Sequence, residues 1–144
     1  MNRRLMFDQL VNKAGDLSFD ELDQFFESLD PVDIEDTLGF WKGGYLKGWE
    51  IFFRNYFIFH WFGKNFISAD KIRAQVWSIL GFKISFGIGN SRLRRVEFRD
   101  KVSTALIYNY LPIIDHFRKV DDDILMGIME IKGRSFVYFY IQRL

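Results

Sequence analysis

Residues 38–44 read Leu38-Gly39-Phe40-Trp41-Lys42-Gly43-Gly44, and this stretch decides how the rest of the chain is interpreted. It is the first place where helical spacing gives way to strand spacing, and it sets one large aromatic residue between two glycines. Glycine lets another backbone approach closely, and tryptophan buries a large apolar area. The pattern therefore predicts a first strand whose Trp41 closes one end of a barrel.

Length, charge and cysteine content exclude several classes of function. The 144 residues are enough for one domain with one hydrophobic core. The formal net charge is +1, so bulk electrostatics do not favour nucleic acid or an anionic membrane as a partner. The chain has no cysteine, which excludes disulfides, thiolate metal sites and a cysteine nucleophile. This composition fits a reducing compartment, and we expect a cytoplasmic protein.

Aromatic residues make up 19% of the chain, which is the unusual feature of its composition. Aromatic side chains bury large areas and are common in strands. So many of them in a short chain predict either a dense core or an apolar cavity. The basic start of the chain is not followed by a long apolar run, and no segment reaches about 18 uninterrupted apolar residues. We therefore expect neither a signal peptide nor a stable insertion in a membrane.

Three helices are predicted before the glycine-tryptophan stretch. Residues 2–14 show weak amphipathic spacing. Ser18 and Glu21 have the spacing of a capping box, which starts a second helix. Asp30 and Pro31, an N-cap residue followed by proline at the first helical position, predict a short third helix.

After the glycine-tryptophan stretch the chain reads mainly as sheet. The aromatic run 49–66 changes from helical to alternating spacing near Phe57. Arg99-Asp100-Lys101 is a candidate for a tight hairpin. The strands predicted in the last part of the chain are residues 92–99, 101–110, 112–120, 124–132 and 135–143. Five short strands with close connections describe an antiparallel meander.

These residues also carry a family likeness. The runs Leu38–Gly44 and Trp61–Phe66 resemble the GXWXG domain family. The runs Lys101–Ala105, Tyr108–Asp123 and Phe136–Tyr140 resemble the C-terminal domain of unknown function that usually accompanies it. The resemblance covers nearly everything after the second predicted helix, and it implies an architecture rather than an activity.

The expected fold is α+β and mostly β, with N-terminal helices that cap a small, lipocalin-like antiparallel β-barrel. We expect one domain over residues 1–144. Residues 1–37 would form the helices, residues 38–88 the GXWXG region, and residues 91–144 the meander that completes the barrel.

The Gly-x-Trp run is also similar to the first-strand signature of lipocalin-like barrels. In those barrels the tryptophan packs against a basic residue of the last strand, so the resemblance implies that Arg143 stacks on Trp41. Gly39 and Gly43 would allow close approach of the backbone, and all four residues are assigned a structural role. A guanidinium more than about 6 Å from the indole would exclude the stacking. The likeness is one of fold and carries no function by itself.

One predicted strand mixes charged and apolar residues on both faces. Its candidates for ligand binding are Asp115, His116, Phe117, Arg118 and Lys119. Mixed faces suit a barrel whose interior holds a few paired polar groups. In a regular strand Asp115 and His116 point to opposite faces, so they do not form a direct couple. A network of salt bridges without a ligand is the structural alternative.

We predict that the protein binds a small hydrophobic or amphipathic ligand, such as a lipid or fatty acid, in a barrel cavity without catalysis. Aromatic residues that include Phe59 and Trp61 would line the cavity, and interior charges would orient a polar head. The competing prediction is a hydrolase or isomerase that uses His116 or an interior carboxylate as acid or base. A third alternative is a partner-binding module or homodimer that uses the aromatic run 49–66 as an interface.

The same aromatic run allows other interpretations. It can be core, with its helical part as a lid on the barrel, or it can be the wall of a cavity. It can also contact a membrane surface as an interfacial helix, although Arg54 and Lys64 are too few for a strong electrostatic anchor.

Metal ions, cofactors and nucleic acid are not expected. Two histidines, His60 and His116, and no cysteine do not support a transition-metal site. Asp121-Asp122-Asp123 lacks the glycine and the distal glutamate of an EF-hand loop, which favours a solvated turn. Neither a P-loop nor a dinucleotide fingerprint occurs. The arginines between residues 92 and 101 are interpreted as a solvated strand face, and no catalytic residue is assigned.

Overall fold

The computed structural model describes residues 2–13, 16–49, 59–79, 82–85 and 90–144. Within these ranges, only the backbone is described for residues 59–62, 73–79, 82–85 and 135. The predicted helical part of the aromatic run therefore lies outside the described residues, together with its change to strand spacing near Phe57.

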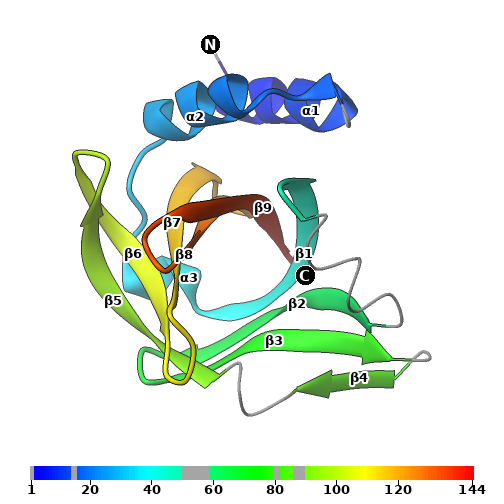
Figure 1. Cartoon of the computed structure of the whole chain (residues 1–144), viewed down its shortest axis with the longest axis vertical. Helices are drawn as coiled ribbons and strands as arrows, with labels where there is room; N and C mark the ends of the chain where they lie inside the picture. Colours follow the sequence, from blue (N-terminus) through cyan, green and yellow to red (C-terminus); the bar gives the residue numbers. More distant parts are fainter. Residues whose placement is uncertain (1, 14–15, 50–58, 80–81, 86–89) are drawn as a thin grey trace.

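Three helices precede the first strand in the described part of the chain (Figure 1). They are α1 (Arg3–Lys13), α2 (Phe19–Ser28) and α3 (Ile34–Thr37). The capping box predicted for α2 is present, because the backbone N–H of Glu21 donates to Ser18 Oγ at 3.1 Å. The Glu21 carboxylate in turn accepts from the backbone N–H of Ser18 at 3.1 Å.

The third helix begins later than predicted, with Asp33 rather than Asp30 as its N-cap. Asp30 instead pairs with Lys119 of the sheet, whose backbone N–H donates to the Asp30 carbonyl at 2.9 Å. Val32 is held in the same way, since its carbonyl accepts from the backbone N–H of Thr104 at 3.1 Å. Pairing with the sheet therefore overrides the local Asp-Pro signal.

Nine strands follow in the described part of the chain. They are β1 (Gly39–Lys47), β2 (Phe59–Ser68), β3 (Lys71–Ile79), β4 (Phe82–Ser85), β5 (Asn90–Phe98), β6 (Lys101–Tyr108), β7 (Ile113–Asp121), β8 (Ile124–Ile131) and β9 (Ser135–Arg143). The five strands predicted in the last part of the chain correspond to β5–β9. Arg99 and Asp100 have φ values of 51° and 66°, which a two-residue hairpin of type I′ requires, so the predicted tight turn is present.

Within the described residues, eight of these strands close into an antiparallel ring (Figure 1). The order around the ring is β1-β2-β3-β5-β6-β7-β8-β9, and β9 returns to pair with β1. The closing pair places Trp41 opposite Arg143. Strand β4 pairs with β3 and extends the sheet outside the ring. The mostly β fold with N-terminal helices and a small antiparallel barrel is therefore confirmed.

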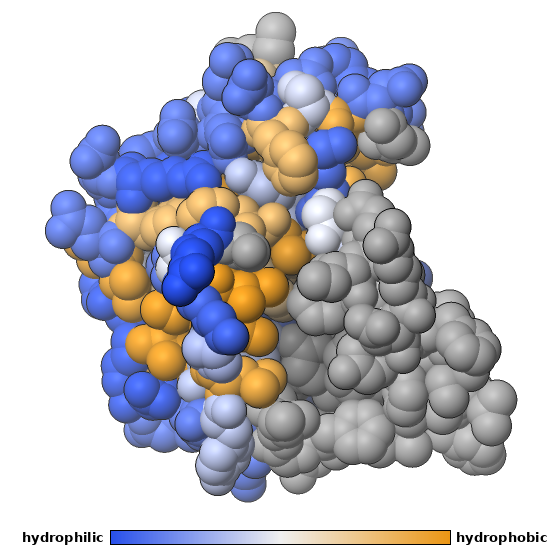
Figure 2. Space-filling view, in the orientation of Figure 1, coloured by the Kyte–Doolittle hydropathy of each residue, from blue (hydrophilic) through white to orange (hydrophobic). Residues whose placement is uncertain are grey.

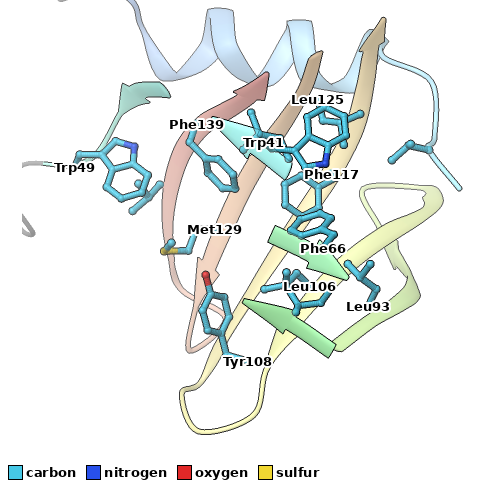
Figure 3. Packing of buried hydrophobic residues seen from close by; sticks show 14 residues of the cluster. Trp41, Trp49, Phe66, Leu93, Leu106, Tyr108, Phe117, Leu125, Met129 and Phe139 are labelled. Atoms are coloured by element: carbon cyan, nitrogen blue, oxygen red, sulfur yellow. The ribbon is translucent and has the colours of Figure 1, made fainter. Parts of the chain in front are cut away.

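Two hydrophobic clusters lie on the two faces of this sheet. The cluster inside the barrel (Figure 3) includes Trp41, Phe66, Leu93, Leu106, Phe117, Leu125, Met129 and Phe139. The cluster between the helices and the outer face of the barrel includes Phe7, Leu22, Phe25, Phe26, Val120, Ile124, Met126, Ile128 and Tyr138. Figure 1 shows α1 and α2 lying across one side of the barrel, and Figure 2 shows that their visible surface is mainly hydrophilic. Strands β7, β8 and β9 are therefore covered on both faces.

Candidate functional site

The glycine-tryptophan strand closes the barrel where α3 joins β1. Trp41 is fully buried, and its Nε1 donates to the Thr37 carbonyl at 2.8 Å. The guanidinium carbon of Arg143 lies 4.1 Å from the centre of the Trp41 ring, so the stacking expected from the sequence is present. Arg143 also donates to the carbonyls of Asp36 and Leu38, both at 2.8 Å. One arginine thus ties the last strand, the tryptophan and the end of α3 together.

Gly39 is required at the start of this strand for two reasons. Its φ of 123° is a conformation that side chains other than glycine rarely adopt. A Cβ atom at this position would also lie 3.0 Å from Nη1 of Arg143. The structural role assigned to Gly43, which pairs with Ile141 of β9, stays a prediction.

Aromatic side chains fill the barrel interior next to Trp41 (Figure 3). The Phe117 ring meets Phe66 and Phe139 edge to face, with centroids 5.8 and 5.7 Å apart. Gly127 lies directly across from both Phe117 and Phe139 on the neighbouring strands. A Cβ atom at Gly127 would lie 2.3 Å from the Phe139 ring, so only glycine leaves room for this aromatic packing.

A charged cluster lies inside the same barrel. Lys64 of β2 and Asp115 of β7 have side chains that are 1% and 0% exposed, and Lys64 Nζ lies 2.9 Å from Asp115 Oδ2. The Tyr108 hydroxyl of β6 donates to the same Oδ2 at 3.0 Å and accepts from Lys64 Nζ at 3.2 Å. The other carboxylate oxygen, Oδ1, is buried and has no hydrogen-bond partner within the described part of the chain. An amine, a carboxylate and a phenol therefore meet in an apolar interior.

Burial and pairing act on Lys64 in opposite directions. Burial in the barrel lowers the pKa of its ammonium group, and the attraction of Asp115 opposes that shift without cancelling it. The ammonium also lies 5.3 Å from the centre of the Phe139 ring and 5.7 Å from that of Tyr108. Aromatic faces stabilise a cation at such distances. The cluster can therefore hold a polar group of a ligand or exchange a proton with it.

Sequence reasoning selects Asp115 but misses Lys64 and Tyr108. The signal for Lys64 is its strand position, because residues two apart share a face and Phe66 of the same strand is buried in the interior cluster. Lys64 also pairs directly with Trp41 across β1 and β2, which places both side chains on the inner face. That pairing becomes visible only once the register of the two strands is known.

His116 and Arg118 face the helices instead of the interior. Arg118 donates to the Phe26 carbonyl of α2 at 3.0 Å, and its guanidinium lies 4.4 Å from the centre of the Phe26 ring. The His116 ring stacks on Phe98 with centroids 3.8 Å apart. The structure therefore does not bring His116 and Arg118 together with Asp115, since neighbouring residues of β7 point to opposite faces.

The outer face carries its own charged groups, which join α2 to the barrel. Arg99 Nη1 lies 2.7 Å from Asp23 Oδ1, and the Tyr138 hydroxyl donates to the same carboxylate. Burial, assisted by this hydrogen bond, raises the pKa of Tyr138 to about 12. His116 Nε2 lies 3.2 Å from Glu130 Oε1, yet burial dominates and lowers the pKa of the imidazole. These contacts give His116 a structural setting on the outer face of the barrel.

Lys119 lies at the rim of the barrel, where its Nζ pairs with Asp122 at 2.8 Å. It borders a pocket of about 240 Å³ that Arg143 also lines. The remaining lining residues are Val32, Asp36, Asp121, Asp122, Asp123 and Leu125. Within the described ranges, no group of three or more histidine, cysteine or acidic side chains could hold a metal ion. The pocket therefore receives no metal assignment.

Several candidates lie on the aromatic run. The side chains of Phe59 and Trp61 on β2 are outside the described residues, so their role as a cavity wall stays a prediction. Trp49 is buried, and its Nε1 donates to the Tyr138 carbonyl at 2.7 Å. The predicted homodimer through this run is not tested by the described side chains. No described helix is long and apolar enough to cross a membrane.

Comparison with known proteins agrees with this fold. One family model, described as GXWXG protein, matches residues 24–77, and a second, described as domain of unknown function (DUF4334), matches residues 89–143. A crystal structure of a protein from Thermomonospora curvata is 31% identical, covers 100% of this chain and 99% of that chain, and has a TM-score of 0.88. No curated protein is significantly similar to the chain. The chain therefore belongs to the GXWXG protein family, and its C-terminal part matches the domain of unknown function DUF4334.

Proposed function

We propose that the protein binds a small hydrophobic or amphipathic ligand inside its barrel, without catalysing a reaction on it. The observation that supports this most is the buried Oδ1 of Asp115, which has no hydrogen-bond partner among the described residues. Buried polar atoms are nearly always paired, because an unpaired acceptor costs about 1–3 kcal/mol. A hydroxyl or amide N–H on a bound ligand would supply the missing donor.

The surroundings of Asp115 suit an apolar ligand body. Across the neighbouring strands Asp115 pairs with Leu106 and Met129, and both side chains belong to the interior hydrophobic cluster. Binding sites for small molecules combine apolar walls with a few polar groups that fix orientation. Figure 2 shows hydrophobic side chains gathered over the barrel in the middle of the view. Phe117 contributes to the inner wall, and Phe59 and Trp61 are proposed to extend it along β2.

The polar part of the site differs from the set proposed from the sequence alone. Lys64, Asp115 and Tyr108 supply the interior polar groups, whereas His116 and Arg118 are engaged under the helices. The site therefore fits an uncharged head that contains a hydrogen-bond donor better than a free anion, because Lys64 is already neutralised by Asp115.

The proposal is tested by comparing two fluorescent ligands that differ by one donor. A dansylated long-chain alcohol and its methyl ether are titrated into the full-length protein, and dansyl emission is recorded. The alcohol is expected to bind more tightly by about 1 kcal/mol or more, because only the alcohol can donate to Asp115. Native mass spectrometry of the protein as purified checks for a retained small molecule.

Two variants make this comparison specific. Replacement of the ion pair by apolar residues, in Lys64→Met/Asp115→Leu, is expected to abolish the difference between alcohol and ether. Asp122→Asn at the exposed rim is the matched control and should preserve it, because the Asp122 side chain is 90% exposed. If wild-type protein binds neither ligand, or binds both equally, the proposed anchoring by Asp115 is wrong.

An enzyme is the second candidate, and one observation favours it. The interior carboxylate of Asp115 lies 2.9 Å from the amine of Lys64 and 3.0 Å from the hydroxyl of Tyr108, an arrangement that suits acid–base chemistry. Turnover of apolar esters or enolisable ketones by wild-type protein would support a hydrolase or isomerase. Such activity should fall in Asp115→Asn at saturating substrate, in protein that circular dichroism shows to be folded. Binding without turnover would leave the non-catalytic function.

A further inference from the structure

Lys64 differs from every other lysine whose side chain the structure describes, because it alone is buried. Its neighbour Lys42 on the adjacent strand, which pairs with Gly63, is exposed. Lysine is among the most costly side chains to bury, so an enclosed one usually has a partner or a chemical role. The partner here is Asp115, and Oδ1 of that carboxylate has no hydrogen-bond partner among the described residues.

The immediate surroundings of Lys64 are those of an amine that can react. Its Nζ is within hydrogen-bond distance of a carboxylate oxygen, at 2.9 Å, and of a phenol oxygen, at 3.2 Å. The same nitrogen faces the rings of Phe139 and Tyr108. A lysine amine becomes nucleophilic when an apolar environment disfavours its charged form, and burial lowers the pKa of Lys64.

We propose that Lys64 captures an apolar aldehyde or ketone inside the barrel as an imine, with Asp115 as counter-ion and proton acceptor and Tyr108 as hydrogen-bonding partner. This inference rests on the interior binding proposed above and names the chemical class of the ligand. The carbonyl group would be the polar head. Attack by Lys64 turns its oxygen into a hydroxyl, and only this hydroxyl supplies the donor that Asp115 Oδ1 lacks among the described residues. The apolar part of the ligand would lie against the aromatic wall.

The reaction balances with groups that are already in the cluster. Lys64 gives its extra proton to Asp115 Oδ2. The free electron pair of Nζ then attacks the carbonyl carbon, so that a C–N bond forms while the C=O π bond breaks and its electron pair moves to the oxygen. One amine proton then moves to the former carbonyl oxygen, which yields a carbinolamine. The hydroxyl takes up the proton held by Asp115 and leaves as water, and the C=N bond forms. The sum is ammonium plus carbonyl giving protonated imine plus water, and Asp115 ends as the carboxylate it was at the start, with no oxidant or reductant.

The arrangement of oxygen atoms fits this sequence of steps. The carbinolamine hydroxyl is an O–H donor, and Asp115 Oδ1 is a buried acceptor that lacks a donor among the described residues. The Tyr108 hydroxyl lies beside both the amine and the carboxylate, and Figure 3 shows it pointing into the barrel toward Met129. A protonated imine would keep the positive charge next to Asp115, so the ion pair of the free protein is conserved.

The test uses an apolar aldehyde, 2-naphthaldehyde, with the full-length protein and sodium cyanoborohydride, which reduces an imine to a stable amine. Intact mass followed by peptide mapping locates the adduct. Labelling of Lys64 is expected to be severalfold faster than that of the exposed Lys42. In concentrated urea this preference should disappear, because all lysine amines are exposed to solvent in the unfolded chain and react at similar rates. Equal labelling of both lysines in the folded protein would overturn the inference.

Variants and a matched alcohol separate this inference from the binding function. The fast labelling by 2-naphthaldehyde should disappear in Lys64→Met and should remain in Lys42→Met. If Lys64→Met does not fold, the comparison of wild-type protein with and without urea replaces this variant. The alcohol 2-naphthalenemethanol cannot form an imine but should bind and slow the labelling of Lys64. If the alcohol binds and Lys64 is not labelled preferentially, the imine inference is wrong and the binding proposal stands. If neither compound binds, both are wrong.

Discussion

The ion pair between Lys64 and Asp115 should be far more costly to break than to replace. Both side chains are almost fully buried, with exposures of 1% and 0%, and the two charged atoms are 2.9 Å apart. Removing one partner leaves the other as an unpaired charge in an apolar interior, which costs about 3–5 kcal/mol. Replacing both with apolar residues of similar volume is often neutral or even stabilising by about 1–4 kcal/mol.

We therefore expect Lys64→Met and Asp115→Leu to destabilise the protein separately and to compensate each other when combined. Each single substitution should lower the free energy of unfolding by about 3–5 kcal/mol, which corresponds to a fall in Tm of roughly 6–20 °C. The double variant should be more stable than either single variant. Oδ1 of Asp115, which has no hydrogen-bond partner among the described residues, strengthens this expectation, because its desolvation is relieved only when the carboxylate is removed.

Urea denaturation followed by tryptophan fluorescence and by circular dichroism measures all four free energies of the cycle. The exposed pair of Lys119 and Asp122, at 2.8 Å with side-chain exposures of 36% and 90%, is the matched control. Its coupling energy should be no more than about 1 kcal/mol, because water screens surface charges. If the double variant at Lys64 and Asp115 loses roughly the sum of the two single losses, the two groups are not coupled and the reasoning fails.

Three further substitutions test other parts of the barrel. Trp41→Ala should cost about 3–5 kcal/mol in urea denaturation because the side chain is fully buried, and wild-type stability would contradict its role in closing the barrel. Gly127→Ala should cost about 1–3 kcal/mol because its Cβ would lie 2.3 Å from the Phe139 ring, and combining it with Phe139→Leu should restore part of the loss. The pKa of His116 is lowered below its ordinary value of 6.5, so His116 binds fewer protons in the folded state than in the unfolded state. The free energy of unfolding should therefore fall as the pH drops through 6.5 and below. His116→Gln should flatten this dependence in denaturation at about pH 7 and about pH 5, and an unchanged slope would contradict its assignment to His116.

Local signals in the sequence predict much of this fold. The spacing of Ser18 and Glu21 identifies the start of α2, and alternation predicts all five strands from β5 to β9. Trp41 and Arg143 meet as the barrel resemblance implied. These features succeed because each depends on nearby residues or on the short motif that carries the barrel resemblance. The Asp30 signal fails because a contact with Lys119, far along the chain, outweighs it.

The site is harder to predict than the fold, for a physical reason. Strand β7 is buried on both faces, by the interior cluster on one side and by α2 on the other, so alternation cannot tell which face is the interior. Asp115 and His116 therefore look equivalent in the sequence. The partners of Asp115 come from β2 and β6, and their distance from it depends on the register of the closed ring.

The pairing of β1 with β9 has a consequence for the order of folding. Arg143 donates to the carbonyl of Leu38, which lies 105 residues earlier in the chain. Contacts of such long sequence separation form late, because the entropy of closing a long loop is lost before they stabilise anything. Until β9 has been synthesised, the edge of β1 that pairs with it has no partner strand. A free edge of this kind can form hydrogen bonds with a strand from another chain. We therefore expect nascent chains to aggregate most readily through the edge of β1 that later pairs with β9. Pairing with β9, together with the hydrogen bond from Arg143 to Leu38, removes this free edge.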